Sequence, residues 1–169
     1  MAVSPAFTAA GGVDGAAMLE LARLNGQEGV VAKRLLSRYR PGERSPDWIK
    51  QPLREVATVL VCGWVGSETR LEALLLAAPH PEGGVRYLGH VGTGFTAVER
   101  RDLLRLMVVR ERSDHPLDTA PPHAAAGARW VQPDLVGEVH YREFTGRLRH
   151  ASWRGLRTDV DTAAAQWPT

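Results

Sequence analysis

The sequence has few lysines, a single cysteine and no long apolar run. Of its 21 basic residues only Lys33 and Lys50 are lysines, which leaves two candidates for any chemistry that needs an amine. Cys62 stands alone, which excludes an internal disulfide, argues against a cysteine-ligated metal and fits a reducing compartment. No stretch approaches the roughly 18 apolar residues of a membrane span, and the first residues do not resemble a secretion signal. We therefore expect a cytoplasmic protein with no membrane partner.

What is present is the composition of an ordinary globular chain. The 169 residues are 44% hydrophobic and 24% charged, with a formal net charge of +2, which allows one domain, or one and a half, with a buried core. The pattern changes around Pro52. We expect three parts: a fragment of a larger domain at 1–52, a complete domain at 53–159 and a flexible tail at 160–169.

The first part predicts one helix and two strands. Asp14 is placed to cap a helix whose apolar residues recur at helical spacing as far as Leu24, and Asn25-Gly26 ends it. Residues 29–36 then predict a strand, 38–46 a turn, and 47–50 a second strand. Two strands need a partner sheet, and nothing earlier in the sequence is long enough to supply one. The first part is therefore expected to be a piece of a larger domain.

The second part predicts a small β barrel. Thr96 is placed to cap an amphipathic helix, and Gly137 marks a bulge or a close approach within a strand. Five strands with a helix between the third and the fourth are typical of an OB-fold barrel, so the expected fold class is mainly β. The expected strands lie at 56–65, 70–77, 85–91, 128–131 and 135–144, with a loop at 113–128.

Basic residues gather in two stretches, one in each part. The first spans residues 28–50 and the second residues 142–157, and both could neutralise nucleic-acid phosphates, with Trp48 and Trp153 available for packing or stacking. A run of charge is more often a solvated face, and an indole is more often a core residue. The histidines have no metal-ligand spacing, and we assign them no site. The arginines concerned are Arg34, Arg38, Arg40, Arg44, Arg142, Arg147, Arg149, Arg154 and Arg157.

Five linked strings resemble the carboxy-terminal half of a bacterial ATP-dependent DNA ligase of the type associated with end joining. Such enzymes join a nucleotidyltransferase domain to an OB domain and seal nicked duplex DNA through an AMP intermediate. The resemblance implies that 1–52 is the end of the first domain and 53–159 the second. The strings are EGVVAKR at 28–34, SRYRPGERSPDWIK at 37–50, YLGHVGTGF at 87–95, ARWVQPDLVGEVHY at 128–141 and GRLRHASWRGLRTD at 146–159.

The resemblance also implies particular roles. Glu28 corresponds to an acid that holds Mg²⁺ or Mn²⁺, and Lys50 to a lysine that contacts the α-phosphate of ATP. Arg157 and Asp159 match two positions of the closing RxDK motif, which orients the pyrophosphate. DNA contacts fall to Arg34, Arg38, Arg40, Arg44, Arg149 and Arg154. Two cationic positions of the pattern are lost, because Pro52 and Val160 replace lysines.

The nucleophilic lysine of the family's KxDG motif is missing. The string Gly12-Val13-Asp14-Gly15 has glycine where that lysine belongs and lies too close to Glu28 to be the motif. We therefore expect no catalytic residue of this kind here and no self-adenylation by these residues alone. Three interpretations remain: a ligase whose KxDG half comes from upstream or from a separate polypeptide, a non-catalytic OB module that binds DNA or a partner, and the remnant of a broken gene.

Overall fold

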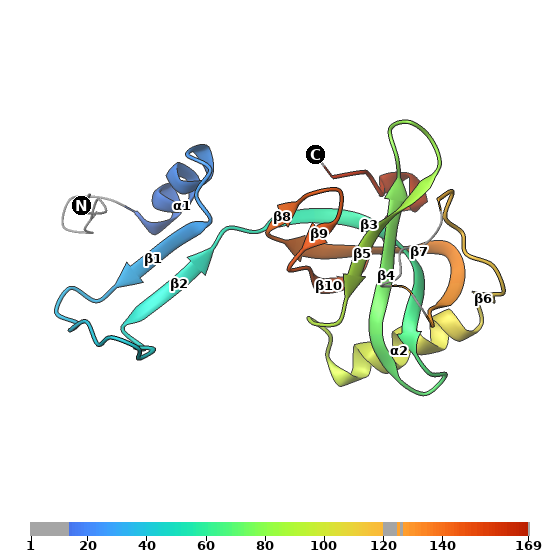
Figure 1. The fold of residues 1–169 in the computed structure, drawn as a ribbon, viewed down its shortest axis with the longest axis horizontal. Helices are drawn as coiled ribbons and strands as arrows, with labels where there is room; N and C mark the ends of the chain where they lie inside the picture. Colours follow the sequence, from blue (N-terminus) through green and yellow to red (C-terminus); the bar gives the residue numbers. More distant parts are fainter. Residues whose placement is uncertain (1–13, 120–124, 126, 169) are drawn as a thin grey trace. The chain divides into compact units, whose positions relative to one another are not determined.

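The computed structural model describes residues 14–119, 125 and 127–168, and the chain forms two compact units (Figure 1). Unit 1 is Met1–Leu53 and unit 2 is Arg54–Thr169. Residues 12 and 13 of the KxDG-like string lie outside the described residues.

Unit 1 is a helix followed by a two-stranded antiparallel hairpin. Helix α1 spans Gly15–Leu24, β1 spans Gly29–Lys33 and β2 spans Trp48–Pro52. Asp14 occupies the N-cap position as predicted, although its side chain makes no capping hydrogen bond. The predicted strand at 29–36 is too long, because β1 ends at Lys33. Beyond it the backbone of Arg34 donates one more bond to the carbonyl of Asp47, and the chain then leaves the ladder.

Unit 2 is built on one antiparallel sheet of six strands. The strand order is β10-β7-β3-β4-β5, and β6 pairs with the first residues of β7. Helix α2 lies in the sequence between β5 and β6, so the prediction of a mainly β fold with an inserted helix is confirmed. The elements are β3 Glu55–Gly66, β4 Leu71–Pro79, β5 Val85–Val91, α2 Ala97–Val108, β6 Glu111–Arg112, β7 Arg129–Tyr141, β8 Glu143–Phe144, β9 Leu148–Arg149, β10 Ser152–Leu156 and the 3₁₀ turn η3 Thr162–Ala164.

Strand β7 joins two strands that the sequence separates. The pattern predicted 128–131 and 135–144, but one strand runs through both and ends at Tyr141. Leu135 pairs with Val61 and Trp130 with Gly63, so the intervening residues of β7 bulge away from β3. Pro133 lies in that bulge, where its lack of an N–H costs no ladder bond.

The sheet curls around a core that two tryptophans dominate. Trp64 and Trp153 are fully buried, and a Cβ placed on Gly137 would overlap the indole ring of Trp153. The close approach predicted at Gly137 is therefore confirmed. The backbone N–H of Trp153 donates to the carbonyl of Thr93 over 3.0 Å, which links the start of β10 to the end of β5. This bond brings the two outer strands of the sheet together.

Helix α2 begins where the sequence predicts. The Thr96 hydroxyl accepts from the backbone N–H of Glu99, and the Glu99 carboxylate accepts from the backbone N–H of Thr96. This reciprocal capping box satisfies two N–H groups that a helix start otherwise leaves unpaired. Leu103, Leu104 and Met107 are the buried residues of the helix, and they pack against the main core.

The carboxy-terminal segment, for which the sequence predicts a flexible tail at 160–169, makes packing contacts with unit 2 in its described part. After η3, Ala165 is buried, and the backbone N–H of Gln166 donates to the carbonyl of Thr58. The ring of Trp167 lies edge-on to Phe144, with centroids 5.4 Å apart, and to His80, with centroids 4.6 Å apart. Burial of the apolar side chains of Ala165 and Trp167 favours the packed segment over a solvated one.

Candidate functional site

The β1–β2 hairpin presents both lysines of the chain on one face. Val31 is directly opposite Lys50 and Lys33 is opposite Trp48, and residues paired in this way share a face of an antiparallel ladder. The Lys50 side chain is exposed. The Lys33 ammonium lies 4.2 Å from the centroid of the Trp48 ring, which holds it by a cation–π contact. The predicted phosphate-binding Lys50 therefore has a second cation on its own face.

Glu28 comes directly before this hairpin. Its carbonyl accepts a hydrogen bond from Leu53, which fixes the backbone at the open end of the ladder. Gly29 is needed there, because its φ is +147° and a Cβ would collide with the Gln51 carbonyl. The Glu28 carboxylate is exposed, and the described residues contain no cluster of three metal-ligating side chains. An exposed carboxylate such as that of Glu28 could supply one ligand to a Mg²⁺ ion, which often takes its other ligands from phosphate and water.

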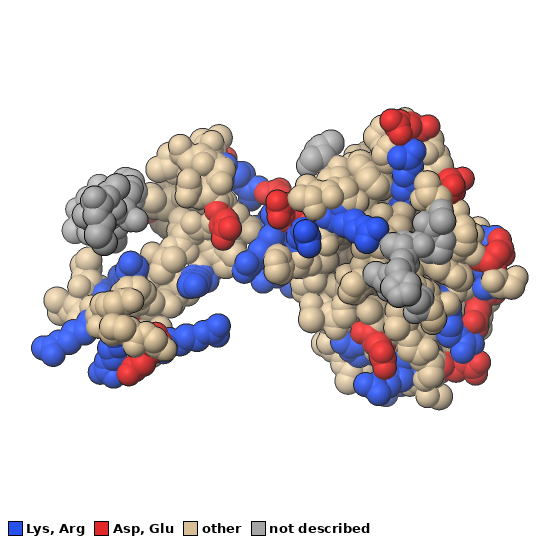
Figure 2. Space-filling view, in the orientation of Figure 1, with Lys and Arg blue, Asp and Glu red and all other residues tan. Residues whose placement is uncertain are grey.

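The connection between β1 and β2 carries four arginines, and Figure 2 shows basic side chains gathered at this end of the hairpin. Arg34 pairs with Asp47 over 3.2 Å, and Arg40 with Glu43 over 3.5 Å. In the described part of the chain no ion pair or hydrogen bond engages Arg38 or Arg44. The structure brings these predicted DNA-binding arginines together on one loop.

Arg157 and Asp159 are bound to each other in unit 2. The guanidinium of Arg157 donates from Nε and Nη2 to the two carboxylate oxygens of Asp159, both over 2.8 Å, and from Nη1 to Glu138 over 3.3 Å. The bonds from Arg157 lower the pKa of Asp159 to about 2 and raise the pKa of Arg157 itself. For Arg157 to bind a phosphate, it must exchange one of these carboxylates for it.

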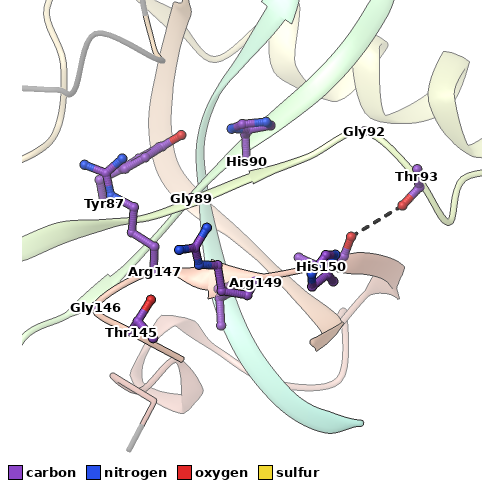
Figure 3. Close-up of a pocket in the computed structure, with 12 residues that line it drawn as sticks. Tyr87, Gly89, His90, Gly92, Thr93, Thr145, Gly146, Arg147, Arg149 and His150 are labelled. Atoms are coloured by element: carbon purple, nitrogen blue, oxygen red, sulfur yellow. Dashed lines mark hydrogen bonds between the residues drawn. The ribbon is translucent and has the colours of Figure 1, made fainter. Parts of the chain in front are cut away.

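A basic groove of about 850 Å³ lies between β5 and the connection from β8 to β10 (Figure 3). Arg147 lies against Tyr87, with its guanidinium carbon 5.4 Å from the ring centroid. Arg149, predicted from sequence, lines the groove, whereas Arg154 on β10 does not. The groove is lined by Tyr87, Gly89, His90, Gly92, Thr93, Thr145, Gly146, Arg147, Leu148, Arg149, His150 and Ala151.

Sequence reasoning missed most of this groove. His90 and His150 lack metal-ligand spacing, so the sequence indicates no site for them, yet both line the groove. His150 also has a left-handed backbone, with φ of 53°, the one such non-glycine residue in the described part of the chain. The two sides of the groove are some sixty residues apart in sequence. The one local pattern that points to it is the alternation of Arg147 and Arg149.

Comparison with known proteins covers both units. Residues 67–160 match the ATP-dependent DNA ligase C-terminal region. The chain belongs to this DNA ligase family. The multifunctional non-homologous end joining protein LigD of Mycolicibacterium smegmatis is 40% identical over 161 residues, or 91% of this chain, and that of Pseudomonas aeruginosa is 40% identical over 143 residues, or 79% of this chain.

Solved structures agree with the sequence comparison. The ligase domain of Mycobacterium tuberculosis LigD superposes with a TM-score of 0.65 at 38% identity and covers 92% of this chain. A mycobacterial DNA ligase D complexed with ATP gives a TM-score of 0.62 at 38% identity, with 90% of this chain covered. The chain spans 21% of the length of the M. smegmatis protein, 17% of the P. aeruginosa protein, 52% of the M. tuberculosis ligase domain and 51% of the ATP-bound ligase. The match therefore identifies the family and the ligase-type fold of these residues.

None of the described helices is long and apolar enough to cross a bilayer. Cys62, the single cysteine, is buried, and burial raises the pKa of its thiol to about 12. A thiol with such a pKa is protonated at neutral pH and is a poor nucleophile.

Proposed function

We propose that this chain supplies the carboxy-terminal part of an ATP-dependent DNA ligase that seals nicked duplex DNA through an AMP intermediate. The observation that carries the proposal is 40% identity over 91% of the chain to a LigD protein, across both units. Glu28 and Lys50 both fall within that shared region and both belong to the hairpin end of unit 1. The ATP and the divalent metal are part of this proposal.

The proposed chemistry depends more on cations placed beside the reacting phosphates than on reactive side chains. Each step of ligation transfers a group at phosphorus, so the protein mainly positions phosphates and neutralises their charge. Lys50 and its neighbour Lys33 would offer cations to phosphate oxygens from one face. Glu28 would hold Mg²⁺, which would neutralise negative charge on the nucleotide. Pro52 and Val160 remove two cations from the family pattern, and we expect a slow first step as a result.

We further propose that unit 2 is an OB barrel that binds DNA. Support comes from the five-strand order, the helix between the third and fourth barrel strands, and the bond that links β10 to the end of β5. The basic groove lies on β5, the third barrel strand, and on the connection between the last two strands. OB folds bind oligonucleotides at this strand and this connection.

The nucleophilic lysine would come from a KxDG half, supplied either upstream of these residues or by a separate polypeptide. Neither Lys33 nor Lys50 lies in a KxDG context, and among the described residues of unit 1 no further strand pairs with the hairpin. A reducing compartment such as the cytoplasm suits this proposal. The alternative is a non-catalytic DNA-binding or partner-binding module, which the loss of two cations at Pro52 and Val160 favours.

The test is transfer of labelled AMP. The purified chain is incubated with α-labelled ATP and Mg²⁺, with and without the amino-terminal half of a mycobacterial LigD ligase domain, and then with nicked duplex. We expect label on the added half and sealing that needs both polypeptides. Lys50→Ala and Glu28→Ala should each lower sealing by about a hundredfold or more, while Arg105→Ala on the exposed face of α2 should have no effect.

Three results would change the proposal. Label on this chain alone would overturn the claim that it lacks a nucleophile, and Lys33→Ala and Lys50→Ala would then locate the amine. DNA binding without sealing in the presence of an adenylated added half would support the binding module. If the chain neither bound DNA nor supported sealing, the result would favour the interpretation that it is the remnant of a broken gene.

A further inference from the structure

The loop between β1 and β2, residues 34–47, carries an exposed tyrosine ring that lies against the partly buried Trp48 at the start of β2. We call Tyr39 and Trp48 the aromatic shelf; their ring centroids are 5.6 Å apart and their planes are tilted by 33°. The Trp48 indole is fixed from two sides. Its Nε1 donates to the Ser37 hydroxyl over 2.9 Å, and the Lys33 ammonium lies over its ring. Trp48 therefore serves as a rigid support for Tyr39.

Tyr39 differs from the other two tyrosines of the chain. Its relative exposure is 69%, whereas Tyr87 is 7% and Tyr141 is 6% exposed. One side of the Tyr39 ring faces Trp48, and the remainder of the ring is open to solvent. The loop that carries it is held by backbone bonds, from Ser37 to Arg34 and from Trp48 to Ser45. A solvent-exposed ring on a loop that backbone hydrogen bonds hold in place contributes little to the free energy of folding and is available to a ligand.

The charge around the aromatic shelf selects the ligand. Residues 33–47 hold five basic and two acidic side chains, and both acids are already paired with arginines. Arg38 and Arg40 flank Tyr39 in the sequence. Cations alone would accept any polyanion, including duplex DNA. An open aromatic ring among cations favours a polyanion that also offers flat ring faces, which an unpaired nucleic-acid strand has and an intact duplex hides.

We propose that the aromatic shelf binds an unpaired strand at the end of a broken duplex, with one base stacked on Tyr39 and the neighbouring phosphates on Arg38 and Arg44. This inference rests on the proposed handling of DNA and adds the class of DNA end. Arg34 and Arg40, which are paired with acids, would hold the loop in shape. The site involves unit 1 alone, at the loop end of the β1–β2 hairpin (Figure 1).

The experiment compares two fluorescent DNA probes by anisotropy, with the full chain at fixed salt. One probe is a blunt duplex, and the other is a duplex of equal total charge with a single-stranded overhang. We expect tighter binding of the overhang probe. Tyr39→Leu should weaken binding of the overhang probe by about tenfold, the effect of losing one stacked base, and leave the blunt probe unchanged. Tyr39→Phe, which keeps the ring, should bind as the wild type does.

Two further variants separate stacking from charge and from general stickiness. Arg38→Ala should weaken both probes equally and lower the salt dependence of log K by about one phosphate contact. Leu36→Ser changes a neighbouring apolar side chain that is 93% exposed, and it should change neither affinity. Thermal unfolding of each variant checks that the exposed substitutions leave the fold intact.

The outcomes distinguish this inference from the proposed function. Equal binding of both probes by the wild type, or no loss in Tyr39→Leu, would overturn the aromatic shelf while DNA binding stands. An equal loss in Leu36→Ser would also overturn it, because the contact would then be a general apolar one. Failure of both probes to bind would count against the DNA proposals altogether.

Discussion

The two units differ in where their apolar and charged side chains lie. Of the eleven large hydrophobic residues that are exposed in the described part, seven belong to unit 1, and Ala22 is the single buried hydrophobic residue there. Unit 2 contains the rest of the buried core. Unit 1 holds seven basic and five acidic residues, whereas unit 2 holds fourteen of each, so the whole net charge of +2 resides in unit 1.

This difference suggests that one unit supplies most of the stability of the chain and the other supplies groups for binding. The described part of unit 1, a two-stranded hairpin beside one helix, buries little apolar surface and leaves seven large apolar residues exposed. A sheet that curls around two tryptophans has a core of its own. We infer that the free energy of unfolding comes mainly from unit 2, and that unit 1 contributes its cations and exposed rings to binding.

The largest expected effect is a cavity in the core of unit 2. Trp153→Ala removes a fully buried indole that packs on Gly137 and Phe95, and it should lower the free energy of unfolding by about 3–5 kcal/mol. The matched change in unit 1 is Ile49→Ala, at a residue that is 62% exposed, which should cost less than about 0.5 kcal/mol. Urea unfolding followed by circular dichroism measures both.

The comparison between the units would break if the two variants lost similar free energy. A cost above about 1 kcal/mol for Ile49→Ala would mean that the hairpin is buried in solution, for example against a second copy of the chain. Sedimentation of the wild type at several concentrations would then identify that contact.

The next effect concerns the carboxy-terminal segment. Trp167→Ala removes the ring that packs between Phe144 and His80, and it should cost about 2 kcal/mol, because the side chain is only partly buried. Gln166→Ala, at an exposed neighbour, should leave stability unchanged. Urea midpoints compare the two variants. No difference between them would restore the loose tail that the sequence predicts and would end unit 2 near Asp159.

Local signals predicted more of this fold than of its sites. The Thr96–Glu99 spacing predicts the capping box of α2, and a glycine inside an apolar strand predicts the close approach at Gly137. These features depend on residues near in sequence or on backbone conformation. The single run of β7 through Pro133 depends on a register that adjacent strands set.

The groove and the packed tail could not be read from the sequence, for a related reason. His90 and Arg147 line one groove because the chain returns to β5 some sixty residues later, and neither residue belongs to a local sequence pattern that predicts this. The ring of Trp167 packs against Phe144, and the short alanine-rich segment that carries Trp167 has no periodic pattern that predicts this contact. Conversely, the family strings single out Glu28, directly before the β1–β2 hairpin, and Lys50 on β2, although periodicity alone gives them no role.

The smallest expected effect concerns one ion pair of unit 2, between Arg157 and Asp159. The pKa of Asp159 is lowered to about 2 mainly by hydrogen bonds from Arg157. The ordinary pKa in an unfolded chain is about 3.9. The pair therefore adds stability above about pH 4, and that contribution is lost as the pH falls through about 2. Because Asp159 is exposed, the change should be small.

Asp159→Asn should flatten the pH dependence of unfolding between about pH 4 and pH 2. Arg157→Gln should flatten the same range, because the guanidinium is the main cause of the lowered pKa. The double variant should then lose no more than either single variant, as expected for two groups that act through one contact. Denaturant midpoints at several pH values measure this. Additive losses would show that Arg157 and Asp159 stabilise unit 2 through different partners, with Glu138 as the second partner of Arg157.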